Sequence, residues 1–200
     1  MRCGSLRGCR AEPVRVFLAL PLPEALRDDL EDLALTLRAG RLVPAENYHV
    51  TLAFLGEQSE ADLERLHVEL QKLSSAPFSL QIEGLEAPGS KAPRVLWAKL
   101  ASNPELTALH KAIRGRLRLC DMDLPRERFR PHITLARFAR PLRRGDAMEI
   151  ASFLQAEGGY RPNAFPYSGF ALYQSRLTSD GALYEELAHY PFQSEPQENP

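Results

Sequence analysis

The chain has 200 residues, of which 44% are hydrophobic and 26% are charged, and its formal net charge at pH 7 is −1. These values are typical of one globular domain or of two small lobes sharing a cleft, and they exclude a global charge that would attract nucleic acid or a membrane. No apolar run approaches the roughly 18 residues of a membrane span, and no signal-peptide pattern follows the basic start. We therefore expect a cytoplasmic monomer with no membrane partner.

The ends of the chain differ in composition from its middle. We expect a disordered leader over residues 1–12, one folded domain over residues 13–191 and a disordered polar tail over residues 192–200. An odd number of cysteines, two of them in the leader, argues against a disulfide framework, and their spacing matches no common zinc site. They are Cys3, Cys9 and Cys120.

Strand and helix patterns alternate along the domain. Ser59 and Asn103 are predicted N-caps, and Gly40 is a plausible stop after the first helix. The internal repetition and the short hairpin turns predict an α+β fold with antiparallel sheets in two pseudo-symmetric lobes. The predicted strands are residues 14–20, 48–55, 78–85, 94–100, 129–138, 164–173 and 182–190, and the predicted helices are residues 24–38, 59–73, 103–119 and 145–156.

One six-residue pattern occurs twice. The segment His-Val-Thr-Leu-Ala-Phe begins at His49, and the segment His-Ile-Thr-Leu-Ala-Arg begins at His132. Side chains alternate between the two faces of a strand, so each histidine shares a face with the threonine two residues later, Thr51 or Thr134. If the two strands face each other, two imidazoles and two hydroxyls converge on one point.

This set of groups suits acid–base chemistry on a phosphate. An imidazole titrates near pH ~6.5, so His49 and His132 could supply one acid and one base on opposite sides of a phosphorus atom. Hydroxyls such as those of Thr51 and Thr134 can donate to the phosphoryl oxygens. The alternative is that the histidines are buried packing residues and the threonines simply favour a strand; the matched pair of motifs argues against it.

Further groups around the motifs are weaker candidates. Arg137 suits a phosphate oxygen, but strict alternation turns it away from His132 unless a bulge or the strand end brings it back. Phe17, Phe54 or Tyr48 could stack on a nucleobase, although core packing explains any one of them as well. A local basic patch or an ordinary solvated surface explains the arginines near the second motif, which are Arg126, Arg128, Arg130, Arg137 and Arg140.

The other three histidines stand apart from these motifs. His67 and His110 lie on predicted helices and His189 ends the last predicted strand. None has a partner at metal-ligand spacing, so we expect no metal site. The sequence also contains no glycine-rich phosphate loop and no nucleophile elbow.

At these residues the chain resembles the two-histidine (2H) phosphoesterase superfamily, whose signature is a pair of His-x-Thr/Ser-x motifs. It is most similar to the RNA 2′,3′-cyclic phosphodiesterases, historically called 2′-5′ RNA ligases. Supporting similarity comes from the first strand, starting at Arg15, and from the segment starting at Phe170. The resemblance implies two lobes flanking a central cleft with helices outside. It also implies hydrolysis of RNA 2′,3′-cyclic phosphate ends, or of nucleoside 2′,3′-cyclic phosphates, to 2′-phosphomonoesters without a metal or other cofactor.

The resemblance further implies a role for each motif residue. His49 would be the proton donor to the leaving 3′-oxygen and His132 the proton acceptor from water. Thr51, Thr134 and Arg137 would bind the phosphoryl oxygens. The alternatives are another nucleotide substrate, such as ADP-ribose cyclic phosphate or a 2′-5′ oligonucleotide, the reverse 2′-5′ ligation of RNA, and a non-catalytic module that binds RNA ends.

Overall fold

The structure is a computed structural model that describes residues 12–89, 92–125, 128–179 and 181–192. The expected leader and tail therefore lie outside the described residues, apart from Glu12 and Phe192. The Phe192 ring stacks on Phe78 with its centroid 5.3 Å away. The packed part of the chain thus includes the first residue that the sequence assigned to the tail.

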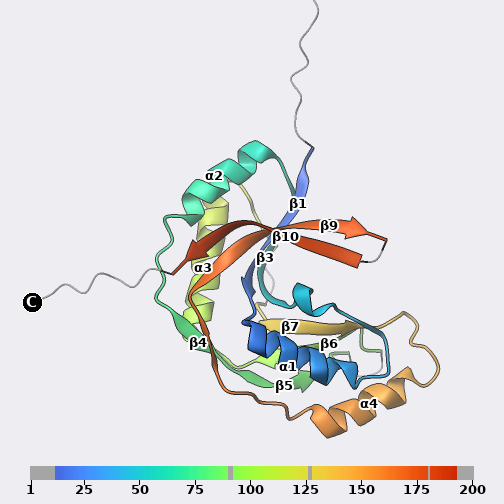
Figure 1. Ribbon diagram of the computed structural model, residues 1–200. Helices are drawn as coiled ribbons and strands as arrows, with labels where there is room; N and C mark the ends of the chain where they lie inside the picture. Colours follow the sequence, from blue (N-terminus) through green and yellow to red (C-terminus); the bar gives the residue numbers. More distant parts are fainter. Residues whose placement is uncertain (1–11, 90–91, 126–127, 180, 193–200) are drawn as a thin grey trace, which may run out of the picture.

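The described residues form ten strands, four α-helices and one short 3₁₀ helix (Figure 1). Two of the predicted strands, over residues 78–85 and 164–173, are each divided in the structure. At Gln81 and again at Ser168, the chain passes from a small two-stranded sheet into the main sheet. The elements are β1 (Val14–Pro21), α1 (Glu24–Leu35), β2 (Arg41–Leu42), η1 (Ala45–Asn47), β3 (His49–Gln58), α2 (Glu60–Leu70), β4 (Phe78–Leu80), β5 (Ile82–Glu86), β6 (Val95–Leu100), α3 (Pro104–Leu119), β7 (His132–Arg137), α4 (Asp146–Glu157), β8 (Phe165–Tyr167), β9 (Gly169–Thr178) and β10 (Gly181–Pro191).

The main sheet has the strand order β10-β9-β1-β3-β7-β6-β5, and β2 adds to β7. Among the described residues, every pairing in this sheet is antiparallel. The order of elements in the first half, β1-α1-β3-α2-β4-β5, repeats in the second half as β6-α3-β7-α4-β8-β9. The halves exchange a strand, because β5 pairs with β6 and β9 pairs with β1. The predicted α+β class and pseudo-symmetric lobes are confirmed, and β2 and β10 are additions to the repeat.

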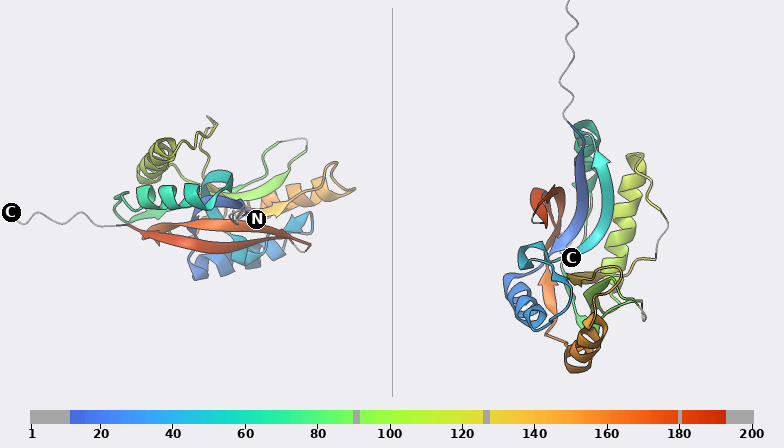
Figure 2. Two further views of the ribbon diagram at one scale, coloured as in Figure 1. Left: turned by 90° about the horizontal axis from the view of Figure 1, so that it is seen from above. Right: turned by 90° about the vertical axis from the view of Figure 1, so that its right-hand side faces the viewer.

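The helices cover the sheet from outside, and each lobe is covered by a helix from the other half. α1 follows β1 but packs near β7, whereas α3 follows β6 and packs near β3; Figure 2 shows α3 running beside β3. The two predicted N-caps are present, since Ser59 Oγ accepts from the Asp62 N–H at 3.2 Å and Asn103 Oδ1 accepts from the Leu106 N–H at 2.6 Å. The predicted stop at Gly40 is wrong, because α1 already ends at Leu35 with Thr36 as its C-cap. Within the described ranges, we find no helix with the length and apolarity that crossing a membrane requires.

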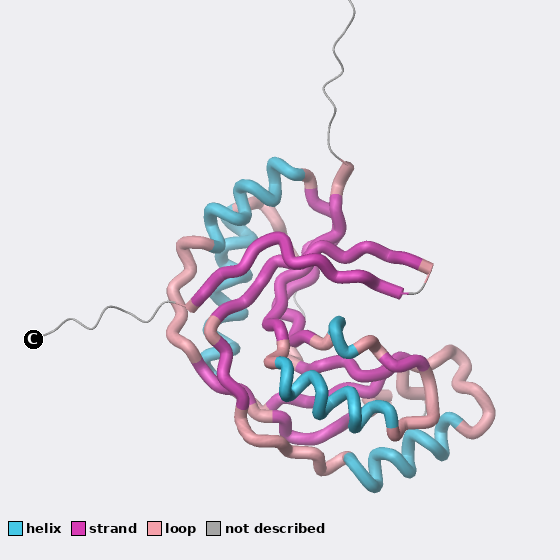
Figure 3. The backbone as a smooth tube through the Cα atoms, in the orientation of Figure 1, coloured by secondary structure: helices cyan, strands magenta, loops and turns pink. Residues whose placement is uncertain are grey.

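The two lobes meet at the motif strands. Val50 of β3 pairs with Ile133 of β7, and both side chains are fully buried in the core. Beyond this pair the strands diverge, and β2 takes the place of β3 beside β7. In Figure 3 the β9–β10 hairpin and the β5–β6–β7 strands extend from this junction on either side. The junction therefore fixes how the two halves of the repeat face each other.

Candidate active site

The pairing of β3 with β7 places both motifs on one face of the sheet. Because Val50 lies opposite Ile133 in an antiparallel register, one further residue on each side sets His49 opposite Thr134 and Thr51 opposite His132. Their side chains point away from the core side that Val50 and Ile133 occupy. His49 and His132 are then diagonal neighbours, a relation in which the Cα atoms of two residues on paired strands lie about 7–8 Å apart.

Each histidine ring is held in the same way. His49 Nδ1 lies 2.8 Å from the carbonyl oxygen of Asn47, and His132 Nδ1 lies 2.8 Å from that of Arg130. A carbonyl only accepts, so Nδ1 carries the hydrogen in both neutral rings and Nε2 is the nitrogen free to accept a proton. The carbonyl belongs to the residue two positions before the histidine in both motifs. The Nε2 atom of His49 also lies 3.0 Å from the hydroxyl of Thr51.

Both imidazoles are less basic than usual. Burial lowers the pKa of His49 from 6.5 to about 4, and the positive charges of His132 and Arg137 act in the same direction. Burial and Arg137 also lower the pKa of His132. The hydrogen bonds to the Asn47 and Arg130 carbonyls oppose these shifts. Arg137 thus acts electrostatically on both rings, and the charge of His132 acts on His49.

A β-bulge brings Arg137 to this face. In β7, Thr134 pairs with Trp97 and Ala136 pairs with Leu96, so Leu135 is an extra residue without a cross-strand partner. Leu135 and Ala136 are consecutively buried, and the exposed Arg137 returns to the side of His132 and Thr134. The bulge that alternation requires for Arg137 is therefore present.

The first motif has a bulge at the equivalent position. Ala19 pairs with Thr51 and Leu18 pairs with Ala53, which leaves Leu52 as the extra residue. The burial pattern of β3 over its first six residues is the same as that of β7. Phe54 consequently occupies the place in the first motif that Arg137 occupies in the second.

The three aromatic residues suggested for base stacking have different surroundings. Phe54 is 63% exposed, whereas Phe17 and Tyr48 are only 2% and 4% exposed. Tyr48 belongs to the hydrophobic core, because it precedes His49 and so points to the opposite face of the strand. The Phe17 ring packs beside that of His49, with the centroids 4.9 Å apart. Only Phe54 therefore offers an open ring face to a ligand.

Two aromatic contacts of the histidines were not predicted from the sequence. Trp97 of β6 lies beside His132, with ring centroids 4.2 Å apart. Tyr184 of β10 meets His49 edge to face at 5.3 Å. Both rings come from strands far away in the sequence, so no local pattern marks them. Each imidazole is therefore packed against an aromatic ring from a distant strand in addition to its backbone hydrogen bond.

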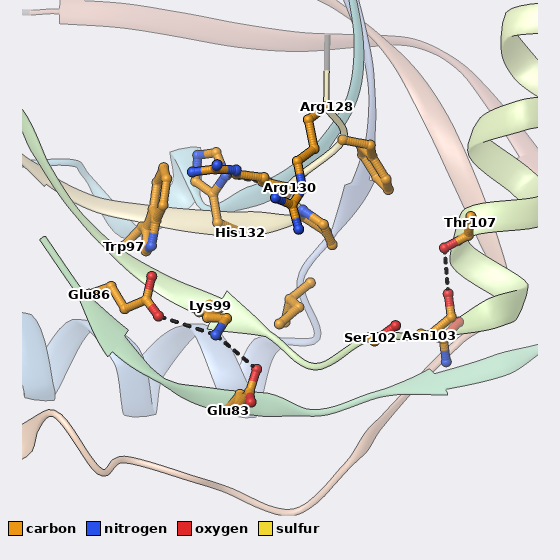
Figure 4. A pocket seen from close by; sticks show the side chains of 13 residues that line it. Glu83, Glu86, Trp97, Lys99, Ser102, Asn103, Thr107, Arg128, Arg130 and His132 are labelled. Carbon is orange, nitrogen blue, oxygen red and sulfur yellow. Dashed lines mark hydrogen bonds and ion pairs between the residues drawn. The ribbon is translucent and has the colours of Figure 1, made fainter. Parts of the chain in front are cut away.

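Open cavities adjoin the motifs. A cavity of about 450 Å³ is lined by residues of both motifs, including Thr51 and His132, together with Phe54 and Trp97. A second cavity of about 540 Å³ extends from His132 past Trp97 to Lys99, which bridges Glu83 and Glu86 at 3.2 Å each (Figure 4). Both volumes suit a small organic ligand.

The basic neighbourhood of the second motif is partly in place. Arg128 and Arg130 line both cavities, and Arg140 is exposed outside them. Arg126 lies outside the described residues. Of the histidines expected to be structural, His67 bonds the Tyr190 hydroxyl and His189 lies near Glu186. His110 stacks on Phe129, and both rings line the cavity that also contains Thr51 and His132. In the part of the chain that the structure describes, no cluster of histidine, cysteine and carboxylate side chains could hold a metal ion.

Comparisons with known proteins agree with this geometry. The RNA 2′,3′-cyclic phosphodiesterase of Archaeoglobus fulgidus is 28% identical over 178 residues, covering 87% of this chain and 98% of its own. That of Thermus thermophilus is 31% identical over 197 residues, covering 91% and 92%. The crystal structure of Escherichia coli LigT complexed with 3′-AMP matches with a TM-score of 0.73 at 26% identity, covering 92% of this chain and all of its own. The family model of the 2′-5′ RNA ligase superfamily matches residues 22–176, and the chain belongs to this family.

Proposed function

We propose that the protein hydrolyses the 2′,3′-cyclic phosphate at RNA 3′ ends to a 2′-phosphomonoester, using His49 and His132 as acid and base without a metal. The observation that carries the proposal is the register of β3 against β7, which puts both histidines and both threonines on one face at the junction of the lobes. The relatives named RNA 2′,3′-cyclic phosphodiesterase support the choice of substrate.

In the proposed reaction a water molecule attacks phosphorus and the bond from phosphorus to the 3′-oxygen breaks. His132 Nε2 accepts a proton from the water, and His49 Nε2–H gives its proton to the departing 3′-oxygen. Both rings suit this exchange, because their Nδ1–H groups are bound to backbone carbonyls and Nε2 is the exchanging atom in each. The products are a free 3′-hydroxyl and a phosphate monoester on the 2′-oxygen.

The donor role requires that His49 gain a proton when substrate binds. With a pKa of about 4, His49 is neutral near pH 7 in the free protein. A cyclic phosphate carries one negative charge, and placing it between the two rings favours the imidazolium form and raises the pKa of His49. Substrate binding thus favours one charged imidazole, and a charge on His132 disfavours a charge on His49. The proposed roles require that this single proton be held by His49 and that His132 be the neutral base.

The proposed phosphate contacts divide between hydroxyls and a guanidinium. Thr51 and Thr134 would each donate to a non-bridging oxygen, and Arg137 would offset the charge that develops on the phosphoryl group. In the free protein the Thr51 hydroxyl faces His49 Nε2 at 3.0 Å. On binding, this hydroxyl turns to the phosphate, and Nε2–H becomes available to the 3′-oxygen.

The test is product analysis in the presence of EDTA. An RNA ending in a 2′,3′-cyclic phosphate is incubated with the protein, and the position of the remaining phosphate is determined. We expect the 2′-phosphomonoester only. His49→Ala and His132→Ala should each reduce kcat by about 10²–10⁴-fold, the typical contribution of one proton transfer.

His189→Ala is the matched control, since it removes an imidazole of β10 that lies near Glu186 and Gly169 and lines none of the cavities beside the motifs. It should retain the wild-type rate. A folded His49→Ala or His132→Ala protein with a near-normal rate would overturn the proposal, as would tight RNA binding without any product. Comparing kcat/KM for ADP-ribose cyclic phosphate and 2′-5′ oligonucleotides identifies a different substrate preference.

A further inference from the structure

A third cavity, of about 490 Å³, lies beside His49 on the side of the β9–β10 hairpin and is lined by three arginines. Arg15 comes from β1, Arg41 from β2 and Arg137 from β7. Among the described residues that line it, none is acidic. The cavity of Figure 4, by contrast, combines Glu83 and Glu86 with its basic groups. The Arg15–Arg41–Arg137 groove is therefore a strongly cationic feature of a protein whose net charge is −1.

Two of these arginines form an unfavourable pair. Arg41 is the direct cross-strand partner of Arg137, and like charges in this position destabilise a sheet. No ion pair with a described carboxylate offsets either guanidinium. The backbone enforces the pairing: Gly40 has a φ of +75°, and a Cβ there would lie 2.7 Å from the Arg137 carbonyl oxygen. An anion bound between the two side chains would relieve this repulsion.

The rest of the groove suits a nucleotide. Its lining includes the exposed side chains of Phe54 and Leu177 and the ring of Tyr184, which also contacts His49. Cationic side chains combined with aromatic and apolar surfaces are the usual means of binding single-stranded nucleic acid. Through Tyr184 and Arg137, the groove is continuous with the two-histidine site.

We propose that the Arg15–Arg41–Arg137 groove binds the phosphodiester group that precedes the terminal nucleotide of an RNA substrate, with Arg41 as the main phosphate-binding residue. The proposal rests on the proposed function. Arg137 then lies between the cyclic phosphate and this second phosphate, and Arg15 lies farther along the groove on β1. A single nucleotide has no such phosphodiester, so the groove makes the enzyme prefer oligonucleotide ends.

The experiment compares kcat/KM for a diadenosine dinucleotide ending in a cyclic phosphate with kcat/KM for adenosine 2′,3′-cyclic phosphate. We expect the wild-type protein to prefer the dinucleotide, and Arg41→Ala to reduce this preference about 10–100-fold, in keeping with one lost charge-assisted hydrogen bond. The preference should weaken as salt increases, and less steeply for Arg41→Ala. The melting temperature of Arg41→Ala without substrate should equal or exceed that of wild type, because a repulsive pair is removed.

Two arginine variants serve as comparisons. Arg38→Ala removes the same charge at an exposed position outside the groove and should leave the preference unchanged. Arg128→Ala tests the rival path through the cavity lined by Thr51 and His132. Loss of the preference in Arg128→Ala instead of Arg41→Ala would overturn the proposal, and so would an unchanged preference in Arg41→Ala or the absence of one in wild type. Failure to turn over either substrate would overturn the proposed function as well.

Discussion

The low pKa of His49 makes the stability of the protein depend on pH in a way that one substitution isolates. His49→Asn removes the titrating ring but keeps an N–H donor for the carbonyl of Asn47, which lies 2.8 Å from His49 Nδ1. The pKa of His49 is about 4 in the folded protein and rises to the ordinary value, near 6.5, on unfolding. Between these values the unfolded chain binds the proton and the folded chain does not. Acidification from pH 6.5 towards pH 4 therefore favours unfolding.

The size of the effect follows from the two pKa values. At pH 7 both states are largely neutral at His49, and the linkage contribution is close to zero. At pH 4.5 the unfolded imidazole is almost fully protonated while the folded one is mostly neutral, which costs about 2.5 kcal/mol of folding free energy. Carboxylates and the remaining histidines titrate in both proteins, so the difference between wild type and His49→Asn reports on position 49.

The assay is urea unfolding of wild type and His49→Asn at pH 7 and pH 4.5. We expect the free energy of unfolding of wild type to fall by about 2.5 kcal/mol more than that of the variant over this interval. Equal losses in the two proteins would show that His49 titrates normally. The burial at the junction of β3 and β7 would then not control its protonation, and the argument that substrate must recharge it would be wrong.

Substitutions at three further positions test neighbouring parts of the site. Ile133→Ala should cost about 2–5 kcal/mol in urea unfolding, against about 0.5–1.5 for Ile133→Val, because the side chain is fully buried at the lobe junction; equal costs would contradict this. Arg137→Gln should raise the pKa of both His49 and His132, because it removes a positive charge that lowers both. The acid limb of the pH profile of kcat/KM should then move to higher pH, and kcat/KM should fall about 10–100-fold. An acid limb at the same pH would refute the electrostatic coupling. Thr134→Val should lower kcat/KM about tenfold while Thr134→Ser retains most of it, and an unimpaired valine variant would show that the hydroxyl is not used.

Local pattern was sufficient for much of the site. Alternation along each motif correctly places the histidine and threonine on one face, and the same rule shows that Arg137 needs a bulge to join them. The structure contains that bulge at Leu135. The helix caps at Ser59 and Asn103 were likewise predictable, because a cap depends on a side chain and a backbone N–H three residues apart.

Long-range pairing was not predictable in the same way. Trp97 and Tyr184 reach the histidines from β6 and β10, and their contribution depends on which strands become neighbours. The two-residue strand that carries Arg41 is too short to show any periodicity, so its position opposite Arg137 follows only from the fold. Tyr48 shows the converse error, in which an aromatic residue next to a motif was considered for stacking although its strand parity directs it into the core.

The two half-sites are equivalent in backbone and differ in the side chains placed on it. In each, the histidine ring is held by the backbone carbonyl of the residue two positions earlier, and a β-bulge follows three positions after the histidine. After the bulge, the first motif presents Phe54 and the second presents Arg137. The shared backbone geometry explains why both histidine rings are held in the same way. A fully symmetric site would not distinguish a proton donor from a proton acceptor. In the proposed reaction, the aromatic ring on one side and the guanidinium on the other, with Arg41 as its cross-strand neighbour, would orient an asymmetric substrate with its charge towards the arginines.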